Sequence, residues 1–455
     1  MLSFLLTIAI HLSLGLGILS LFPAMDFKFG RLGYLLLAYP VGLAGMAFLS
    51  VVTAIFGLHF GYLIIGALSL VGLVFGIIGI RKVKRGVARP GMTGRPFIIW
   101  VFVAVLLAVV AVTAYNSVVL PETGYDSMGI WTIRARMIAH HDGYIRAAWD
   151  EYIAVFGDLT RFPPEWPMYP SGWPFAMSWV TAISGNTYSA WPKVLNLVNW
   201  LAIGLVLMAL LWRKVGWFSI IGWALFSLGP LFHNQAFAGY AELPMILLLF
   251  AGFFVFVENR NTSGYILGGL LLGAAMLIKN EGLFFAMPIA AVIAYFSIRK
   301  RDWVFWAIVP GILILFKLFG IMFDNSMSYR VSMDLFDLSL GGFFGRFSRS
   351  IGYIFSSLFL QDNFGIVPHL VVLLPIVLIP FKMDRREWFS VAIIGIFILE
   401  FAFMGGISPE RVYSYYGQRV VIERFCMNLF PYFCYLSTVF VASGIEKTFP
   451  DGARK

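Results

Sequence analysis

Charged side chains are scarce in this chain of 455 residues, and cysteine is almost absent. Charged residues make up 12% of the sequence, whereas a soluble domain usually carries about 25%, so an ordinary water-soluble globular protein is excluded. Cys426 and Cys434 fall in what reads as a single helix, where a rise of about 1.5 Å per residue separates them by roughly 12 Å. A disulfide needs Cα atoms within about 7 Å. These cysteines therefore neither pair nor indicate a redox compartment.

Several functional motifs are missing as well. The sequence has no internal repeat, no Walker loop and no GxGxxG, so nothing indicates a nucleotide held in a standard phosphate cradle. It also lacks the nucleophile elbow of a serine hydrolase. His140 and His141 are adjacent, and no third ligand follows at metal spacing, so we predict no metal site there.

Long apolar runs dominate what is present. Apolar residues make up 60% of the chain, and runs near the roughly 20 residues that span a bilayer recur from end to end. We therefore predict an all-α polytopic membrane protein with about 13 transmembrane helices. The first run lacks the basic region of a secretory signal, so we interpret it as a retained helix. The predicted spans are 4–22, 32–57, 62–80, 96–114, 193–212, 216–232, 243–257, 264–278, 283–298, 303–322, 366–381, 388–406 and 425–445.

The positive charges predict the orientation of these spans. Lys and Arg concentrate in short connectors, and such connectors face the cytoplasm. The basic connectors are 81–95, 212–214, 299–301, 381–386 and the tail 446–455. Alternating the spans then places 115–192, 232–242, 279–282, 323–365 and 407–424 on the outer side. The net charge of +10 is explained by this topology and by contact with lipid headgroups, so no nucleic-acid partner is predicted.

The chain divides into three parts on this basis. Residues 1–95 form an N-terminal three-helix transmembrane segment with a basic cytoplasmic loop, for which we expect a packing or accessory role. Residues 96–445 form the main transmembrane module, and 446–455 are a cytoplasmic tail.

Two long outer segments carry features of their own. In the first, 115–192, the stretch Ser127 to His141 has the spacing of an interfacial helix, with Arg134 and Asp142 expected to face water. The Pro-rich stretch 161–175 cannot run as one helix, and its aromatics suit the headgroup layer. In the second, 323–365, we interpret 343–360 as an interfacial or re-entrant helix, because a full span would place the basic connector 381–386 outside.

A set of charges on the predicted outer side is left after the topology signals are removed. Several of them directly adjoin hydrophobic runs, where an unpaired ion costs at least a few kcal/mol, so such ions are normally paired or functional. Carboxylates can deprotonate an attacking hydroxyl, and cations can hold a departing phosphate. A lipid-phosphate-linked sugar would need both. The set comprises Asp126, Arg134, Arg136, Glu242, Lys279, Glu281, Arg330, Arg419, Glu423 and Arg424.

The order of the short motifs resembles one enzyme superfamily. GYDSMGIWTIRARMI, YPSGWPF, GYAELPM, LIKNEG and ERFCMNLFP follow one another along residues 96–445. This order is similar to that of the GT-C superfamily, which comprises membrane glycosyltransferases that use polyprenyl-phosphate sugars and includes protein O-mannosyltransferases and lipid A aminoarabinose transferases. The resemblance leaves the first three spans unexplained.

The resemblance implies a role for each matching residue. Asp126 matches the catalytic carboxylate of the first outer loop, with Glu242 as the assisting acid. Lys279 and Arg424 match ligands of the donor phosphate, with Arg134 as a further cation. The remaining candidates are acceptor or supporting residues, namely Glu281, Tyr169 and Tyr125. A divalent metal shared by Asp126 and Glu242 would also be compatible with the family, and no other cofactor is expected.

These observations predict a glycosyltransferase that moves a sugar, with inversion, from a polyprenyl-phosphate donor to a hydroxyl or amine acceptor. The acceptor would be a glycan, a lipid or a protein. The expected location is the bacterial cytoplasmic (inner) membrane, with the site on its periplasmic or extracellular face. Two alternatives stay open: a transporter or flippase for a lipid-linked sugar, which would place its charges at the membrane midplane, and a non-catalytic membrane scaffold, which would need none of the outer acids.

Overall fold

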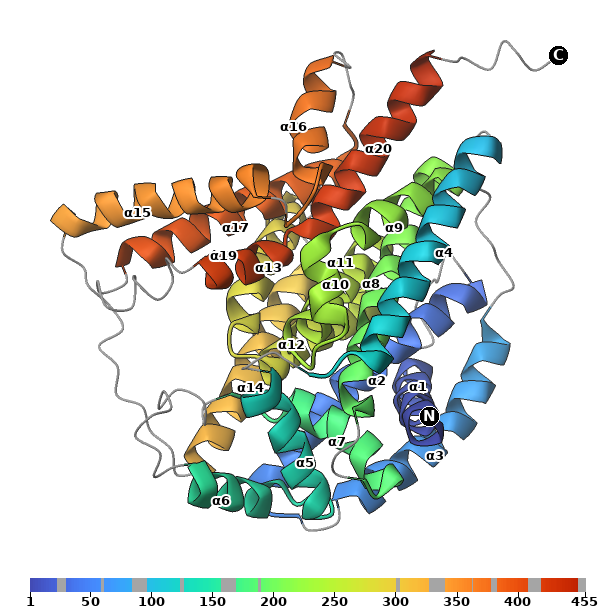
Figure 1. Ribbon diagram of the computed structural model, residues 1–455, viewed down its shortest axis with the longest axis vertical. Coiled ribbons are helices and arrows are strands. Elements are labelled where there is room, and N and C mark those ends of the chain that lie inside the picture. Colours follow the sequence, from blue (N-terminus) through green and yellow to red (C-terminus); the bar gives the residue numbers. More distant parts are fainter. Residues whose placement is uncertain are drawn as a thin grey trace.

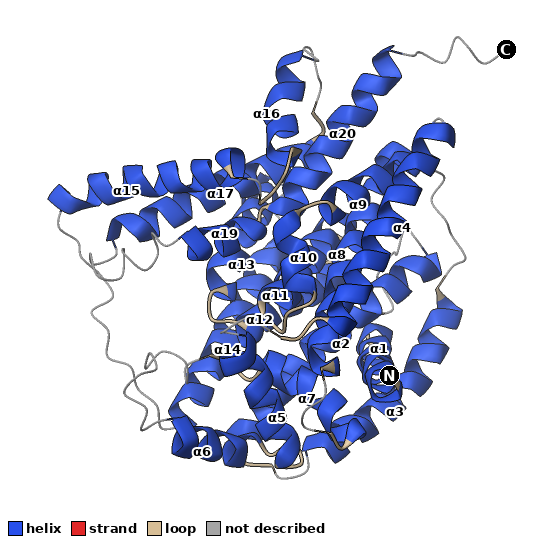
Figure 2. Cartoon of the chain, in the orientation of Figure 1, coloured by secondary structure: helices blue, strands red, loops and turns tan. Residues whose placement is uncertain are grey.

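The computed structural model describes residues 1–22, 30–58, 61–83, 96–122, 127–156, 169–186, 190–299, 303–326, 340–361, 363–377, 383–407 and 419–448. These residues are helical almost throughout and include no strand (Figure 2). A helix satisfies its backbone hydrogen bonds within one segment, which is what a bilayer requires of a single spanning element. The predicted all-α class is confirmed for this part of the chain.

The helices of the first half lead from the N-terminal segment to the middle of the molecule (Figure 1). They are α1 (Leu2–Ser20), α2 (Gly30–Ile55), α3 (Gly61–Lys82), α4 (Pro96–Val119), the π-helix η1 (Ser127–Thr132), α5 (Ile133–His140), α6 (Ile145–Phe156), α7 (Gly172–Ser184), α8 (Trp191–Val215), the 3₁₀-helix η3 (Gly216–Phe218), α9 (Ser219–Ser227) and α10 (Pro230–Ala236).

The second half begins with two paired helices at the centre. Its elements are α11 (Glu242–Glu258), α12 (Thr262–Ile278), α13 (Gly282–Arg299), α14 (Trp303–Ser326), α15 (Leu340–Phe355), the π-helix η4 (Ser356–Leu360), α16 (Val367–Val377), α17 (Arg385–Ile407), α19 (Arg419–Met427) and α20 (Phe430–Thr448).

Seven of the described helices are long and apolar enough to cross a membrane, so the chain is an integral membrane protein. These stretches are Leu2–Ser20, Arg31–Ile55, Gly61–Lys82, Ile99–Val119, Trp191–Trp212, Trp303–Met322 and Arg385–Ile407. Four shorter apolar helices accompany them, namely Gly216–Ser227, Thr262–Ile278, Gly282–Tyr295 and Phe430–Ile445. The count of about 13 spans and the sidedness of the membrane stay predictions.

The three N-terminal helices pack closely on one another through glycine. A side chain at Gly42 of α2 would collide with the backbone oxygen of His11 in α1, and one at Gly17 would collide with Gly72 of α3. Small residues at such crossings let helix backbones approach in a membrane. The segment is not set apart, because α2 also packs against α7, α8, α11, α12 and α14.

The pair α11 and α12 lies at the centre of the fold (Figure 1). Every residue of α11 is buried, and this helix contacts α2, α8, α12 and α13. In contrast, α3, α4 and α14 expose large apolar side chains such as Leu70, Leu107 and Ile314. In a membrane protein such faces are suited to lipid. Because other helices surround α11, polar side chains at either of its ends can be shielded from lipid.

Helix α15 lies along α17 (Figure 1). The Nε of Arg346 donates a hydrogen bond of 3.0 Å to the backbone oxygen of Gly406 near the end of α17. The rings of Phe343 and Phe403 meet in an edge-on contact at 5.8 Å. That α15 is interfacial or re-entrant stays a prediction.

Two predicted spans are interrupted, which corrects their boundaries. The span 216–232 breaks after α9 at Leu228–Gly229, and the span 425–445 breaks at Asn428–Leu429 between α19 and α20. Pro230 and Pro431 each fall in the first turn of the next helix, where a missing N–H costs nothing. The sequence is apolar across both breaks, so hydropathy alone does not predict them.

The second break separates the cysteines. Cys426 lies in α19 and Cys434 in α20, so they do not share one helix as predicted. Both are free and buried, in agreement with the expectation that they do not pair.

The outer stretch 127–141 also differs from its prediction. It consists of a π-helix followed by α5, and Arg134 is only 3% exposed instead of facing water. Its guanidinium donates to the backbone oxygen of Tyr169 and to the hydroxyl of Ser171, each at 2.8 Å. Trp173 and Phe175 are likewise fully buried and are not placed to reach a headgroup layer. Fixed acceptors inside the protein replace water as partners for this guanidinium.

Candidate functional site

Helix α11 begins at a buried carboxylate that faces two cations. Glu242 is 1% exposed. Its Oε1 lies 3.1 Å from the Nζ of Lys279, which directly follows α12, and 3.7 Å from Nη1 of Arg424 in α19. Three separate segments of the chain thus supply one ion network. Glu242, Lys279 and Arg424, all candidates from the sequence, thus meet in the structure.

Lys279 also pairs with Glu281, at 3.2 Å. Burial lowers the pKa of Lys279, but the carboxylates of Glu242 and Glu281 outweigh this effect and hold the pKa above its ordinary value. Tyr169 is close enough to interact electrostatically with the same ammonium group. Arg424 stacks over the ring of Tyr240 at 4.7 Å. We call Glu242, Lys279, Glu281 and Arg424 the Lys279 cluster.

Two carboxylate oxygens of the Lys279 cluster have no hydrogen-bond partner among the described residues. Two carboxylates face two cations, so the formal charges balance. Among the described groups, however, Oε2 of Glu242 and Oε2 of Glu281 are buried and have no hydrogen-bond partner. A buried acceptor without a partner is costly. Both oxygens therefore retain acceptor capacity that no described group uses.

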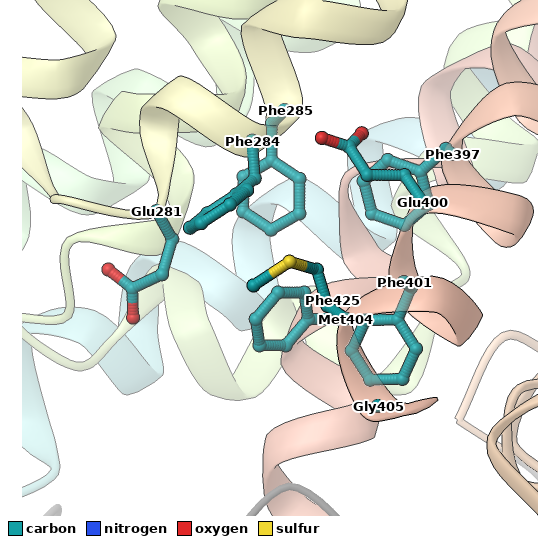
Figure 3. A pocket seen from close by; sticks show the side chains of 9 residues that line it. All are labelled: Glu281, Phe284, Phe285, Phe397, Glu400, Phe401, Met404, Gly405 and Phe425. Atoms are coloured by element: carbon teal, nitrogen blue, oxygen red, sulfur yellow. The ribbon is translucent and has the colours of Figure 1, made fainter. Parts of the chain in front are cut away.

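An apolar cavity adjoins the cluster at Glu281 (Figure 3). The cavity is small, with a volume of about 40 Å³. Phe285 stacks on Phe397 at 5.1 Å, and Phe401 meets Phe425 edge-on at 4.8 Å. The cavity is lined by Glu281, Phe284, Phe285, Phe397, Glu400, Phe401, Met404, Gly405 and Phe425, from α13, α17 and α19 with Glu281 just before α13. In Figure 3 the rings and Met404 fill the centre, and the carboxylates of Glu281 and Glu400 lie on opposite sides of them.

Asp126 and Tyr125 lie outside the described residues, but both flanks of that segment are described. On one side, Glu122 accepts hydrogen bonds from the hydroxyls of Ser127 and Thr132, the latter at 2.6 Å. On the other, Ser127 accepts from the backbone N–H of Gly239 at 2.6 Å. The sequence neighbour of Asp126 is therefore bonded to the loop that leads into Glu242.

That loop, residues 238–240, is held by side chains that the sequence analysis missed. Asn196 of α8 donates to the carbonyl oxygens of Ala238 and Tyr240, the latter at 2.7 Å. Trp173 of α7 donates to the carbonyl of Gly239 at 2.9 Å. These hydrogen bonds fix the position of Tyr240 and of the residues that lead into α11.

Further hydrogen-bonding side chains lie on α8 before and after Asn196. Lys193 is 1% exposed and donates to the backbone oxygen of Leu120, near Glu122. Asn199 donates to Asn196 at 3.0 Å and accepts from the hydroxyl of Tyr39 in α2 at 3.1 Å. Lys193, Asn196 and Asn199 recur every three residues within an apolar span, and such a polar stripe on one helix face was the signal available in the sequence.

Glu122 is expected to matter for stability. Glu122→Gln should lower the free energy of unfolding by about 2 kcal/mol, because it removes the charge that accepts two hydroxyl hydrogen bonds and faces buried Lys193. Thermal unfolding in detergent measures the change. The matched control is Glu151→Gln, whose partner His141 lies 2.8 Å away in a solvent-exposed pair, and the expected loss is at most about 1 kcal/mol. Equal losses in the two variants would contradict this role of Glu122.

Arg134 stands apart from the Lys279 cluster. Besides its bonds to Tyr169 and Ser171, its guanidinium packs on the ring of Trp149 at 5.4 Å. It lines a separate small hollow with residues of α5 and α6. Tyr169 connects the two places, since it accepts from Arg134 and also lies near Lys279.

The remaining candidates are only partly described. Arg330 and the side chain of Arg419 lie outside the described part of the chain, while Glu423 is buried in α19 beside Arg424. Within the described residues no three His, Cys, Asp or Glu side chains gather as metal ligands. Comparison of the chain with protein-family models, with curated proteins and with solved structures gave no match.

Proposed function

We propose that this protein is a membrane glycosyltransferase that moves a sugar from a polyprenyl-phosphate donor to a hydroxyl or amine acceptor. The observation that carries the proposal is the meeting of Lys279, Arg424 and Glu242 at the start of α11, next to an apolar cavity. A lipid phosphate needs cations for its head and an apolar surface for its tail. The motif order of the GT-C superfamily supports the same assignment.

In this proposal the two cations hold the donor phosphate. Arg424 and Lys279 now share the carboxylate of Glu242, and phosphate oxygens would bring further acceptors for their N–H groups. Their positive charge then stabilises the negative charge that builds on the phosphate as the sugar leaves. The position of both groups at helix ends fits a headgroup that is reached from within the membrane.

The aromatic cavity holds the start of the lipid tail. Its lining is almost entirely Phe and Met, and it begins at Glu281, which pairs with Lys279. A tail in this cavity would run between α13 and α17 while its phosphate meets Lys279. The donor would enter laterally from the lipid.

The acceptor is activated by a carboxylate. Asp126 takes the proton of the acceptor hydroxyl or amine as its oxygen or nitrogen attacks the anomeric carbon. The bond from that carbon to the phosphate oxygen breaks at the same time, and the phosphate keeps the electron pair, so the configuration inverts. Glu242, Glu281, Tyr169 and Tyr125 are proposed to orient the acceptor. The support for Asp126 is the tie of its neighbour Ser127 to Gly239.

A divalent metal at Glu242 does not fit the groups described there. Lys279 and Arg424 already face this carboxylate, and a metal ion beside them would meet two positive charges. We therefore derive no step through a metal. We propose the bacterial inner membrane as the location, with the site on the outer face, on the strength of the basic connectors and the family resemblance.

The tail cavity gives a direct test of the donor class. The purified protein in nanodiscs is supplied with radiolabelled polyprenyl-phosphate sugars and an acceptor, and transfer is measured. Phe401→Ala should raise the KM for the long-chain donor about 10-fold, since it removes a ring that lines the cavity, with little change for a short-chain analogue. Phe403→Ala on the same helix is the control, because Phe403 packs on Phe343 and does not line the cavity.

The same assay separates the alternatives. A transporter would move the intact lipid-linked sugar between leaflets without cleaving the bond to phosphate. Equal KM values for Phe401→Ala and Phe403→Ala would contradict the tail site, and failure of every polyprenyl-phosphate sugar to react would contradict the enzyme class.

A further inference from the structure

A second charged cluster lies at the other end of α11. Glu258, the last residue of this helix, is buried, and its Oε1 lies 2.8 Å from Nη2 of Arg386 at the start of α17. The two residues line a hollow together with Val257 and Arg260. The 17 residues of α11 span about 25 Å. This hollow is therefore remote from the Lys279 cluster and takes no part in the reaction proposed above.

Two guanidinium groups, of Arg260 and Arg386, line the hollow, and that of Arg385 lies beside Arg260. Arg260 and Arg385 both lie over the ring of Phe389, at 5.6 and 5.0 Å. Arg260 is exposed as a whole, but partial desolvation of its guanidinium lowers its pKa, and the nearby charges of Arg385 and Arg386 lower it further. Like charges are thus held together at a cost in free energy. We call Arg260, Arg385, Arg386 and Glu258 the Arg386 cluster.

Neighbouring acids cancel part of this positive charge. Asp384 and Glu387 are both paired with Lys214 of α8, Asp384 at 2.9 Å. Of the residues that line the hollow, Glu258 alone is acidic, and it faces Arg386. With Lys214, Asp384 and Glu387 counted beside the Arg386 cluster, four cations face three acids, which leaves a formal surplus of one positive charge.

A buried donor lies beside the same groups. Tyr435 of α20 is fully buried, and its hydroxyl has no hydrogen-bond partner among the described residues. It interacts electrostatically most strongly with Glu387 and Asp384, and also with Arg386 and Glu258. A buried hydroxyl without a partner is unfavourable, and an anion bound nearby could accept a hydrogen bond from it.

We infer that the Arg386 cluster is a binding site for a phosphate-bearing anion. Arginine offers a planar fork of N–H donors that matches phosphate oxygens, and the ring of Phe389 holds two of these forks in place. Basic pockets between transmembrane helices bind the headgroups of anionic lipids. The phosphate can come from such a headgroup or from inorganic phosphate in solution, and the experiment below distinguishes the two.

The test measures binding to the purified full-length protein. Phosphatidylglycerol is titrated against the protein in detergent and bound lipid is counted by native mass spectrometry, with phosphatidylcholine as the reference lipid. In a second arm, inorganic phosphate is titrated and the shift in melting temperature is followed. Arg260→Gln should weaken binding of the first phosphatidylglycerol about 5-fold, because one basic group near a lipid surface contributes about that factor.

Two further variants make the result specific. Arg385→Gln should weaken binding by a similar factor, because it removes the other guanidinium on Phe389. Arg81→Gln, at the end of α3, removes the same charge from another basic segment and should leave the affinity unchanged. Arg260 is exposed and Arg81 is a surface residue, so both variants should fold.

Each outcome either supports or overturns the proposed anion site. Loss in both arms supports the site and shows that phosphate alone suffices, while loss only with phosphatidylglycerol supports the site and identifies a lipid headgroup as the source. Equal affinities of Arg260→Gln, Arg385→Gln and Arg81→Gln in both arms overturn the inference. Sugar transfer by Arg260→Gln should equal that of the unmodified protein, so failure here and failure of the proposed reaction are distinguishable.

Discussion

Replacement of Asp126 by asparagine is expected to lower the rate of sugar transfer about 1,000-fold while donor binding persists. The amide keeps the size of the side chain but cannot take a proton, and a positioned general base contributes roughly 100- to 10,000-fold. The donor phosphate is proposed to meet Lys279 and Arg424, which this change does not touch. Single-turnover transfer with bound donor measures the chemical step by itself.

The matched control for this variant is Asp142→Asn. Asp142 also belongs to the first predicted outer segment, and its backbone has a φ of 51°, a conformation that asparagine adopts readily. This control should transfer sugar at the normal rate. If Asp126→Asn retained a rate within threefold of the control, Asp126 would not be the base.

Substitution of Lys279 by methionine is expected to have the second large effect, on both stability and donor binding. Removing one partner of a buried ion pair typically costs about 3–5 kcal/mol, because the other charge is left uncompensated. The loss should fall at the lower end, since Arg424 remains 3.7 Å from Glu242. Donor binding should fall at least 10-fold. Thermal unfolding and binding of a polyprenyl phosphate measure the two effects separately.

A double variant separates stability from function in Lys279→Met. Adding Glu242→Gln removes one of the two carboxylates that lose Lys279 as a partner, so part of the lost stability should return. Donor binding should not return, because the cation that meets the phosphate is still missing. Recovery of both properties together would mean that Lys279 serves only to neutralise Glu242.

The Lys279 cluster could be predicted because its members interrupt apolar runs. Glu242, Lys279 and Arg424 each adjoin a span, and a charge in that position needs a partner. The common face followed from the basic connectors. The membrane class and the all-α fold rest on the same contrast between apolar runs and sparse charge, which is a strong signal over a whole chain.

Other features depend on contacts that hydropathy does not encode. The apolar run through 425–445 gave no sign of the break at Asn428, although Pro431 marks where the next helix begins. Arg134 looked like a water-facing residue on an interfacial helix, yet its partners Tyr169 and Ser171 lie more than 30 residues further along the chain. Glu122 was overlooked because it stands alone in a loop, and only folding brings Lys193 to it.

The bond from Tyr39 to Asn199 gives the first three helices a part in the geometry of the site. Because Asn199 donates to the oxygen of Asn196, the amide group of Asn196 must point its N–H bonds at the carbonyls of Ala238 and Tyr240. If the amide of Asn196 were rotated, its oxygen would face the carbonyl oxygens of Ala238 and Tyr240, and the hydrogen bonds that hold the loop would be lost. Helix α2 thereby helps to hold the loop that leads into Glu242.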